Sequence, residues 1–291
     1  MDWITGLQSA IDYIDNNLTE ELDYSEIAKS AYSSSFHFQR VFGILCGYSL
    51  GEYIRYRRLS LAGSELASSD AKVIDIALKY GYDSQESFGR AFSRFHGITP
   101  SQAKTDGAKL KSFSKLSVKL ILDGGSIMNY RIEKKDSFDV VVKKRYYPTD
   151  MEVSMKQIPK FWDSCRNDGT TTQLCKYITK GNVFGDAVVG MCFEESEKEN
   201  EFIYAIGSAY NGGEVAEQLS VEKIPAHTWT IFECVGPMPE AIQNLLHKIY
   251  SEFFPTSEYQ PNGGLNFEVY PDGDIKSPDY KCEIWISVER K

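Results

Sequence analysis

Arginine occurs together with glutamine at two places in the first third of the sequence, at Gln39 with Arg40 and at Gln85 with Arg90. Side chains of these two types can hydrogen-bond to the base edges and phosphates of DNA. If both groups lie on the exposed faces of helices, the first third of the chain could read a DNA duplex.

Carboxylates stand two residues from an aromatic side chain near the end of the sequence, Glu268 with Tyr270 and Glu283 with Trp285. On a strand, residues two apart share a face, so each strand would present a carboxylate beside a ring. If those faces line one cleft, they offer a charge partner and cation–π surfaces to a lipophilic cation. On the residues alone, the simpler interpretation is favoured: exposed glutamates, with the aromatic rings in the core.

Other kinds of chemistry find little support. The four histidines are dispersed and the six cysteines contain no CxxC pair, which argues against a zinc site or a disulfide framework. There is no glycine-rich phosphate loop and no nucleophile with a partner set, so we expect no catalytic residue, no metal and no cofactor. No apolar run approaches about 18 residues, so we expect no membrane segment and a cytoplasmic protein.

An internal repeat positions the first group of residues. AKSAYSSSFHFQRVFGILCGYS resembles ALKYGYDSQESFGRAFSRFHGIT, and each copy predicts a short helix, a turn and a longer helix with a buried phenylalanine stripe. The paired positions are Phe38, Arg40, Phe42 and Gly47 in one copy and Phe88, Arg90, Phe92 and Gly97 in the other. The side chains left facing outward are Phe36, Gln39 and Arg40, and then Gln85, Glu86, Ser87 and Arg90.

The segment between the copies could space them for DNA. Residues 51–68 predict one helix, roughly 25 Å long at about 1.5 Å per residue. Such a spacer could hold two helices in successive major grooves, about 34 Å apart. Thr99, Pro100 and Gln102 predict the start of a last helix. A duplicated helical hairpin without a nucleic-acid role is the alternative, and the outward arginines and the spacer favour DNA binding over it.

Net charge leaves this question open. The chain carries −9 overall, with 14 basic and 15 acidic residues up to residue 128 and 18 and 26 after it. The acidity therefore lies in the second part, while DNA binding needs only a local basic face.

From residue 129 onward the pattern changes to a second repeat, strand–helix–strand–strand. The expected elements are residues 138–147, 152–168, 187–193 and 201–207, then 228–235, 239–254, 265–270 and 281–289. If the two strand–helix–strand–strand halves pack side by side, they leave a concave seam between them. Ligands commonly bind in such a seam. The lysine-rich residues 109–127 are interpreted as a solvated linker, with phosphate contacts as the alternative.

Residues 7–104 resemble the DNA-binding domain of the AraC family of transcription regulators. The motifs are IAKSAYSSSFHFQRVF, GYSLGEYIRYRRLSLA and VIDIALKYGYDSQESFGRAFSRFHGITP. The resemblance implies a bacterial regulator with two helix-turn-helix units that bind double-stranded DNA, and RNA polymerase as a further partner. Tyr32 replaces the usual turn glycine, at some cost to the turn. The candidate DNA-contacting residues are Ser35, Phe36, Gln39, Arg40, Ser84, Gln85, Glu86, Ser87 and Arg90.

Residues 129–290 resemble the gyrase-inhibitor-like effector domain of multidrug-sensing regulators, through GPMPEAIQNLLHKIYSEFFPTSEY, LNFEVYPDGD and YKCEIWISV. The resemblance implies an aromatic pocket for small hydrophobic, often cationic compounds, with an acid at its base. By motif position that acid is Glu283, with Glu268 as the nearby candidate, and Ser287 replaces a usual proline. The candidate effector-binding residues are Glu283, Glu268, Trp162, Tyr270, Trp285, Tyr146, Phe193 and Tyr204.

We therefore expect a multidomain protein. An all-α double helix-turn-helix domain occupies residues 1–108, a linker residues 109–127, and an α+β domain of two strand–helix–strand–strand repeats residues 128–291. The expected function is sequence-specific transcription regulation in response to a small ligand. Two alternatives for the second part stay open: hydrolysis of small electrophiles by a pocket glutamate, or protein contacts without a ligand.

Overall fold

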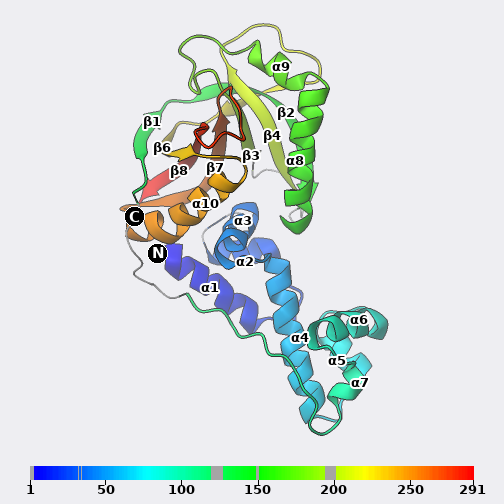
Figure 1. The fold of residues 1–291 in the computed structure, drawn as a ribbon. Coiled ribbons are helices and arrows are strands. Elements are labelled where there is room, and N and C mark those ends of the chain that lie inside the picture. The colour runs from blue at the N-terminus through cyan, green and yellow to red at the C-terminus, as the bar shows by residue number, and fades with distance from the viewer. Residues whose placement is uncertain (1–2, 32, 34, 119–126, 149–150, 194–200) are drawn as a thin grey trace.

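The computed structural model describes residues 3–31, 33, 35–118, 127–148, 151–193 and 201–291. A helical part, α1 to α7, is followed by a strand-rich part built on one sheet (Figure 1). This arrangement confirms the expected fold class. Among the residues described, none of the helices combines the length and the apolar character needed to span a bilayer.

Reciprocal capping boxes mark where two helices of the first part begin. Ser49 and Glu52 form a capping box at the start of α4, and Thr99 and Gln102 form another at the start of α7, as predicted. The helices are α1 (Trp3–Asn16), α2 (Tyr24–Ser30), α3 (Ser35–Cys46), α4 (Leu50–Ser68), α5 (Val73–Lys79), α6 (Gln85–His96) and α7 (Pro100–Ala103).

The predicted duplication of the helical part is confirmed. α2 and α3 form the first copy and α5 and α6 the second, with α4 between them. The four stripe residues are each 0% exposed: Phe38, Phe42, Phe88 and Phe92. Gly47 and Gly97 follow the longer helices with φ of 75° and 80°, a left-handed conformation that glycine adopts without steric strain.

The segment that leads to the second part packs along the helices. Phe113 and Leu116 contact the apolar core around α1 and α3, and Arg57 donates to the Phe113 carbonyl at 2.5 Å. The expectation of a solvated linker therefore needs correction for residues 109–118: their lysines are exposed, but the apolar side chains between them pack on the helices. Residues 119–126 lie outside the described residues.

The strand-rich part forms one antiparallel sheet in the order β1-β6-β8-β7-β3-β4-β2-β5. Two units, β6-β8-β7 and β3-β4-β2, meet at β7 and β3, and in each a helical segment that begins with α10 or α8 follows the first strand, which confirms the predicted repeat. β1, β5 and α9 were not predicted. The elements are β1 (Tyr130–Lys135), β2 (Phe138–Pro148), α8 (Met151–Asn167), α9 (Thr170–Cys175), β3 (Val188–Phe193), β4 (Glu201–Tyr210), β5 (Ser220–Ile224), β6 (His227–Val235), α10 (Glu240–Lys248), the π-helical turn η1 (Ile249–Phe253), α11 (Phe254–Thr256), β7 (Tyr259–Tyr270) and β8 (Lys281–Arg290).

The two faces of the sheet bury different side chains. α8 and α10 cover one face, here called the helix face, where they pack on residues such as Tyr204 and Ile284. The opposite face buries Trp229, Phe267 and Trp285, each at most 2% exposed. Because side chains alternate along a strand, a shift of one residue decides which face a group occupies.

α3 connects the two parts into one core. It contacts α8, α10 and η1, and Figure 1 shows it between α8 and α10. Phe38 and Val41 of α3 belong to the same apolar cluster as Leu246 and Ile284 of the second part. α3 therefore lies over the seam on the helix face where the two halves of the sheet meet.

We expect Phe88→Ala to lower the free energy of unfolding by about 3–5 kcal/mol, because it leaves a cavity in the core between α4 and α6. Arg90→Ala, on the exposed face of the same helix, should change it by less than about 0.5 kcal/mol. Urea unfolding followed by helical circular dichroism measures both. Equal effects of the two substitutions would contradict the assigned faces of α6.

Candidate functional site

The helices α3 and α6, here called the reading helices, carry the candidate DNA contacts, and α6 presents them to solvent. Ser84 caps α6 by accepting from the Ser87 amide at 3.2 Å, and Gln85 and Glu86 in the first turn are exposed. The Arg90 side chain is 70% exposed and pairs with Glu86 at 2.6 Å. Exposed pairs of this kind are weak, so Arg90 is available to a phosphate or a base.

The other reading helix, α3, is covered. Gln39 is 2% exposed and donates to the Ser35 hydroxyl at 3.2 Å, and Arg40 points into the second part of the chain. The expectation that both side chains face solvent is wrong, because α8, α10 and η1 pack against α3, and Glu268 of β7 contacts Arg40. The side chain of Phe36 and the turn residue Tyr32 lie outside the described residues.

Arg40 forms an ion pair with Glu268 on β7. The guanidinium Nη2 contacts the carboxylate Oε1, and the two side chains are 20% and 15% exposed. The Tyr270 hydroxyl donates to the other carboxylate oxygen, Oε2, at 3.0 Å. A charge removed from water needs both a counter-charge and hydrogen bonds, and this arrangement supplies both.

Aromatic side chains surround this carboxylate. Trp162 Nε1–H donates to the Tyr204 hydroxyl at 2.8 Å, and the rings of Trp162 and Tyr270 meet edge to face, 5.4 Å between centroids. Gly190, opposite Glu268 in the ladder, makes room: a Cβ there would lie 3.1 Å from the Trp162 ring and closer still to the Tyr204 hydroxyl. Carboxylate and aromatic rings together suit an organic cation.

The protonation of the cluster follows from its burial and charges. Burial opposes the charge on Arg40, but the attraction of Glu268 outweighs it, so the pKa of Arg40 lies above its ordinary value. Burial, followed by the charge of Glu268, raises the pKa of Tyr204 and of Tyr270 well above the ordinary value. Arg40 is therefore charged and both phenols are neutral; the Tyr270 hydroxyl donates to Glu268, and the Tyr204 hydroxyl accepts from Trp162.

His37 makes a second polar contact between α3 and the strand-rich part. The Asn266 amide donates to Nδ1 at 3.0 Å, which leaves Nε2–H to donate to the Tyr250 hydroxyl at 3.1 Å. His37 is 4% exposed, and burial, followed by the charge of Arg40, lowers its pKa to about 4. The neutral imidazole therefore helps to hold α3 in place.

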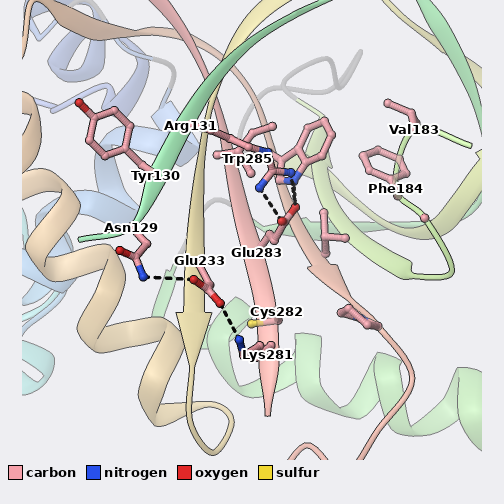
Figure 2. Close-up of a pocket in the computed structure, with 14 residues that line it drawn as sticks. Asn129, Tyr130, Arg131, Val183, Phe184, Glu233, Lys281, Cys282, Glu283 and Trp285 are labelled. Carbon is pink, nitrogen blue, oxygen red and sulfur yellow. Dashed lines mark hydrogen bonds and ion pairs between the residues drawn. The ribbon is translucent and has the colours of Figure 1, made fainter. Parts of the chain in front are cut away.

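A second candidate site is an open groove of about 580 Å³ on the opposite face of the sheet, shown in Figure 2. Arg131 donates to both oxygens of the Glu283 carboxylate, at 2.7 and 3.1 Å, and Trp285 Nε1–H donates to it at 2.8 Å. Glu233 and Lys281 form a further pair at 3.1 Å. These ion pairs are all made within the strand-rich part, and the Glu283 side chain is 29% exposed.

The two candidate acids lie on opposite faces of the sheet. Glu268 stands opposite Ile284 in the ladder and Glu283 opposite Val269, so they alternate. The expectation that both line one cleft is therefore wrong. The expected residues that gather around Glu268 are Trp162, Tyr204 and Tyr270. Those on the face of Glu283 are Trp285, Phe193 and Tyr146.

Sequence analysis missed the partners of these acids and of His37. Tyr250 and Asn266 acquire their role only through a contact between distant parts of the chain, which periodicity cannot reveal. Arg131 lies on β1, a strand that was not predicted. Arg131 and Glu133 are two residues apart, and this spacing could have indicated a strand with both side chains on one face.

We expect His37 to titrate near pH 4 in the full chain rather than near its ordinary pKa of 6.5. The Tyr250 hydroxyl and the Asn266 amide contact its imidazole, and the charge of Arg40 acts on it from nearby. The arrangement in which α3 is covered stabilises the neutral form of the His37 imidazole. The contribution of His37 to that arrangement is therefore complete above pH 6.5. It weakens by roughly 1.4 kcal/mol per pH unit as pH falls from 6.5 to 4.

NMR titration of the imidazole Cε1–H, assigned with His37→Gln, measures this midpoint. A midpoint near pH 6.5 would mean that the imidazole is exposed in solution and that α3 is not covered.

Both parts of the chain match known families. Residues 27–106 match the family described as helix-turn-helix domain, and residues 131–288, more than half of the chain, match Cass2, the integron-associated effector binding protein. These matches confirm the two resemblances seen in the sequence.

Three relatives are similar to the helical part. The transcriptional activator AarP of Providencia stuartii is 47% identical over 89 residues, covering 31% of this chain and 66% of AarP. The regulatory protein SoxS of Salmonella typhimurium is 40% identical over 95 residues, covering 33% of this chain and 89% of SoxS. YbfP of Bacillus subtilis is 37% identical over 100 residues, 34% of each chain. The chain thus spans less than two thirds of AarP and of YbfP.

Two solved structures are similar over 56% of this chain, each with 23% identity and a TM-score of 0.48. One is a bacterial transcription regulation protein from Staphylococcus aureus MU50, of which 99% is covered. The other is SAV2435 bound to tetraphenylphosphonium, of which 94% is covered.

The family match over more than half of the chain, together with the near-complete coverage of SoxS, decides the assignment. The chain belongs to the AraC family of transcription regulators, and its helix-turn-helix domain is followed by an effector-binding domain of the integron-associated type.

Proposed function

We propose that the protein is a sequence-specific DNA-binding transcription regulator that responds to a small hydrophobic cation bound at Glu268. Family membership supports the DNA-binding role. The observation that carries the effector role is a carboxylate, 15% exposed, that lies among aromatic rings and already holds a cationic side chain. The partners in this proposal are double-stranded DNA in the bacterial cytoplasm and RNA polymerase.

The proposed domain limits are residues 1–108 for DNA binding, residues 109–127 for the linker and residues 128–291 for effector binding. The two family matches, residues 27–106 and 131–288, fall inside these limits.

DNA would be read by α6 and α3 together. Gln85, Glu86 and Arg90 supply the contacts of α6, and Gln39 and Arg40 those of α3 once it is uncovered. The 19 residues of α4 span about 28 Å, which suits two helices in successive major grooves about 34 Å apart.

Glu268 suits an organic cation better than Glu283 does. The Glu268 carboxylate is more buried and contacts a guanidinium from another domain, which can leave. Glu283 is more exposed and already binds Arg131 through two hydrogen bonds within its own domain. A new cation would have to displace Arg131 in a setting where water screens the attraction.

The two alternatives for the second part have less support. A hydrolase finds no support among the relatives, which are transcription regulators. Protein contacts without a ligand would account for the covering of α3 but would require no cluster of rings around Glu268. An absence of affinity for every cation tested would favour that second alternative.

We expect Arg90→Ala to weaken binding to a duplex selected from a random-sequence pool by about 1–3 kcal/mol, roughly 5- to 150-fold. The reason is the loss of one exposed guanidinium from α6. Arg166→Ala, which removes an exposed arginine from α8, should leave the affinity unchanged. Fluorescence anisotropy at fixed salt measures both. Equal affinities of all three proteins would contradict DNA reading by α6.

We expect the full chain to bind tetraphenylphosphonium more tightly than the neutral triphenylphosphine oxide. Glu268→Gln should lower this preference by roughly tenfold or more, because it removes the charge but keeps the shape of the side chain. Isothermal titration calorimetry without DNA measures the ratio of the two affinities. Glu283→Gln should leave that ratio unchanged.

A preference that survives in Glu268→Gln would refute the proposed site. If the preference is lost in Glu283→Gln instead, the effector belongs in the groove of Figure 2.

A further inference from the structure

The two copies of the repeat differ in one respect. Arg40 and Arg90 occupy equivalent positions, yet the Arg40 side chain is 20% exposed and that of Arg90 is 70% exposed. The difference arises outside the repeat, because the strand-rich part covers α3 and leaves α6 uncovered. An α-helix fills the major groove when it reads bases, so α3 cannot enter DNA while it is covered in this way.

Polar groups hold α3 at the seam through two separate contacts. Arg40 pairs with Glu268, and His37 is hydrogen-bonded to Tyr250 and Asn266. The space that remains between α3, η1 and these strands is about 10 Å³, room for roughly one water molecule. While α3 is in place, a ligand larger than water therefore cannot reach Glu268 from this side.

The Arg40 guanidinium, which pairs with the Glu268 carboxylate, resembles the proposed lipophilic cation. A guanidinium is a planar, delocalised and weakly hydrated cation that packs on aromatic rings. Arg40 brings this cation to Glu268, beside Tyr270 and close to Tyr204. The same carboxylate thus serves a DNA-reading side chain and the effector, and it can hold one of them at a time.

We propose that Arg40 is an internal competitor of the effector, so that a lipophilic cation at Glu268 releases α3 from the strand-rich part and makes it available to DNA. This inference rests on the effector site proposed above and adds the direction of coupling. The cation and DNA bind with positive cooperativity, because each favours the arrangement in which α3 is uncovered.

The thermodynamic linkage between two ligands of one protein supports this positive cooperativity. A ligand shifts an equilibrium only when it binds the two states with different affinity, and a blocked site meets that condition. Coupling is reciprocal, so DNA must raise the affinity for the cation by the same factor. The burial of two charges at the Arg40–Glu268 contact contributes little net stability, which keeps the covered state reversible.

The test uses variants of the strand-rich part, which leave both reading helices unchanged. Glu268→Gln breaks the ion pair and also disables the cation site. Tyr250→Phe removes only the hydroxyl that contacts His37 and keeps the ring. Glu222→Gln is the control, because it makes the same chemical change in an ion pair far from α3, between Glu222 on the edge strand β5 and Lys144 on β2, which are 28% and 32% exposed.

Fluorescence anisotropy with a duplex selected from a random-sequence pool, at fixed salt, gives the DNA affinity with and without tetraphenylphosphonium. For the wild-type chain we expect the cation to raise the affinity by a factor in the range of roughly 5 to 150. Glu268→Gln should bind DNA tightly without the cation and respond no further. Tyr250→Phe should show raised DNA affinity and keep its preference for the cation. Glu222→Gln should behave as wild type.

Two results would overturn the inference while leaving the effector site intact. One is calorimetric binding of the cation through Glu268 with no change in DNA affinity. The other is that Glu268→Gln and Tyr250→Phe bind DNA, without the cation, no more tightly than the control Glu222→Gln does. A cation preference that does not depend on Glu268 would instead remove the effector site itself, and calorimetry without DNA distinguishes these cases. Circular dichroism of each variant verifies that it is folded.

Discussion

A carboxylate that is buried among aromatic rings requires a cation beside it, and the arrangement of this protein follows from that requirement. Glu268 meets it with Arg40, which the chain brings from its other domain. The pair lies where α3 packs over the seam of the sheet through Phe38 and Val41, a position in which Gln39 and His37 are buried and only the second reading helix is exposed. An ion pair thus joins the DNA-binding half to the effector-binding half.

The sheet decides which residues can share that contact. Its two three-strand units meet at β7 and β3, where Glu268 stands opposite Gly190. The missing side chain at Gly190 allows Trp162 and Tyr204 to come close to the carboxylate. Glu283 is next to this position in the ladder but on the other face, where Arg131 binds it. Strand alternation therefore separates two glutamates that look equivalent in the sequence.

Local patterns predicted the elements of this protein well. The phenylalanine stripe at Phe38 and Phe42, the capping box at Thr99 and the strand–helix–strand–strand order all depend on neighbours in sequence, and the structure contains them. The burial of Gln39 could not be predicted, because an isolated helix-turn-helix domain would expose it. Contacts between domains depend on surfaces that no periodicity describes, and the site at Glu268 is made of such contacts.

The packed segment 109–118 has a consequence for how the protein moves on DNA. It returns along α4 toward α1, so the strand-rich domain is attached beside α3 and far from α6 (Figure 1). If α6 contacts phosphates as proposed, a molecule whose α3 is covered still presents Arg90 and keeps a weak, salt-dependent affinity for any duplex. Such a molecule can reside on the chromosome before any signal arrives. Under the proposed coupling, the release of α3 is then the step that separates this weak binding from binding by both helices.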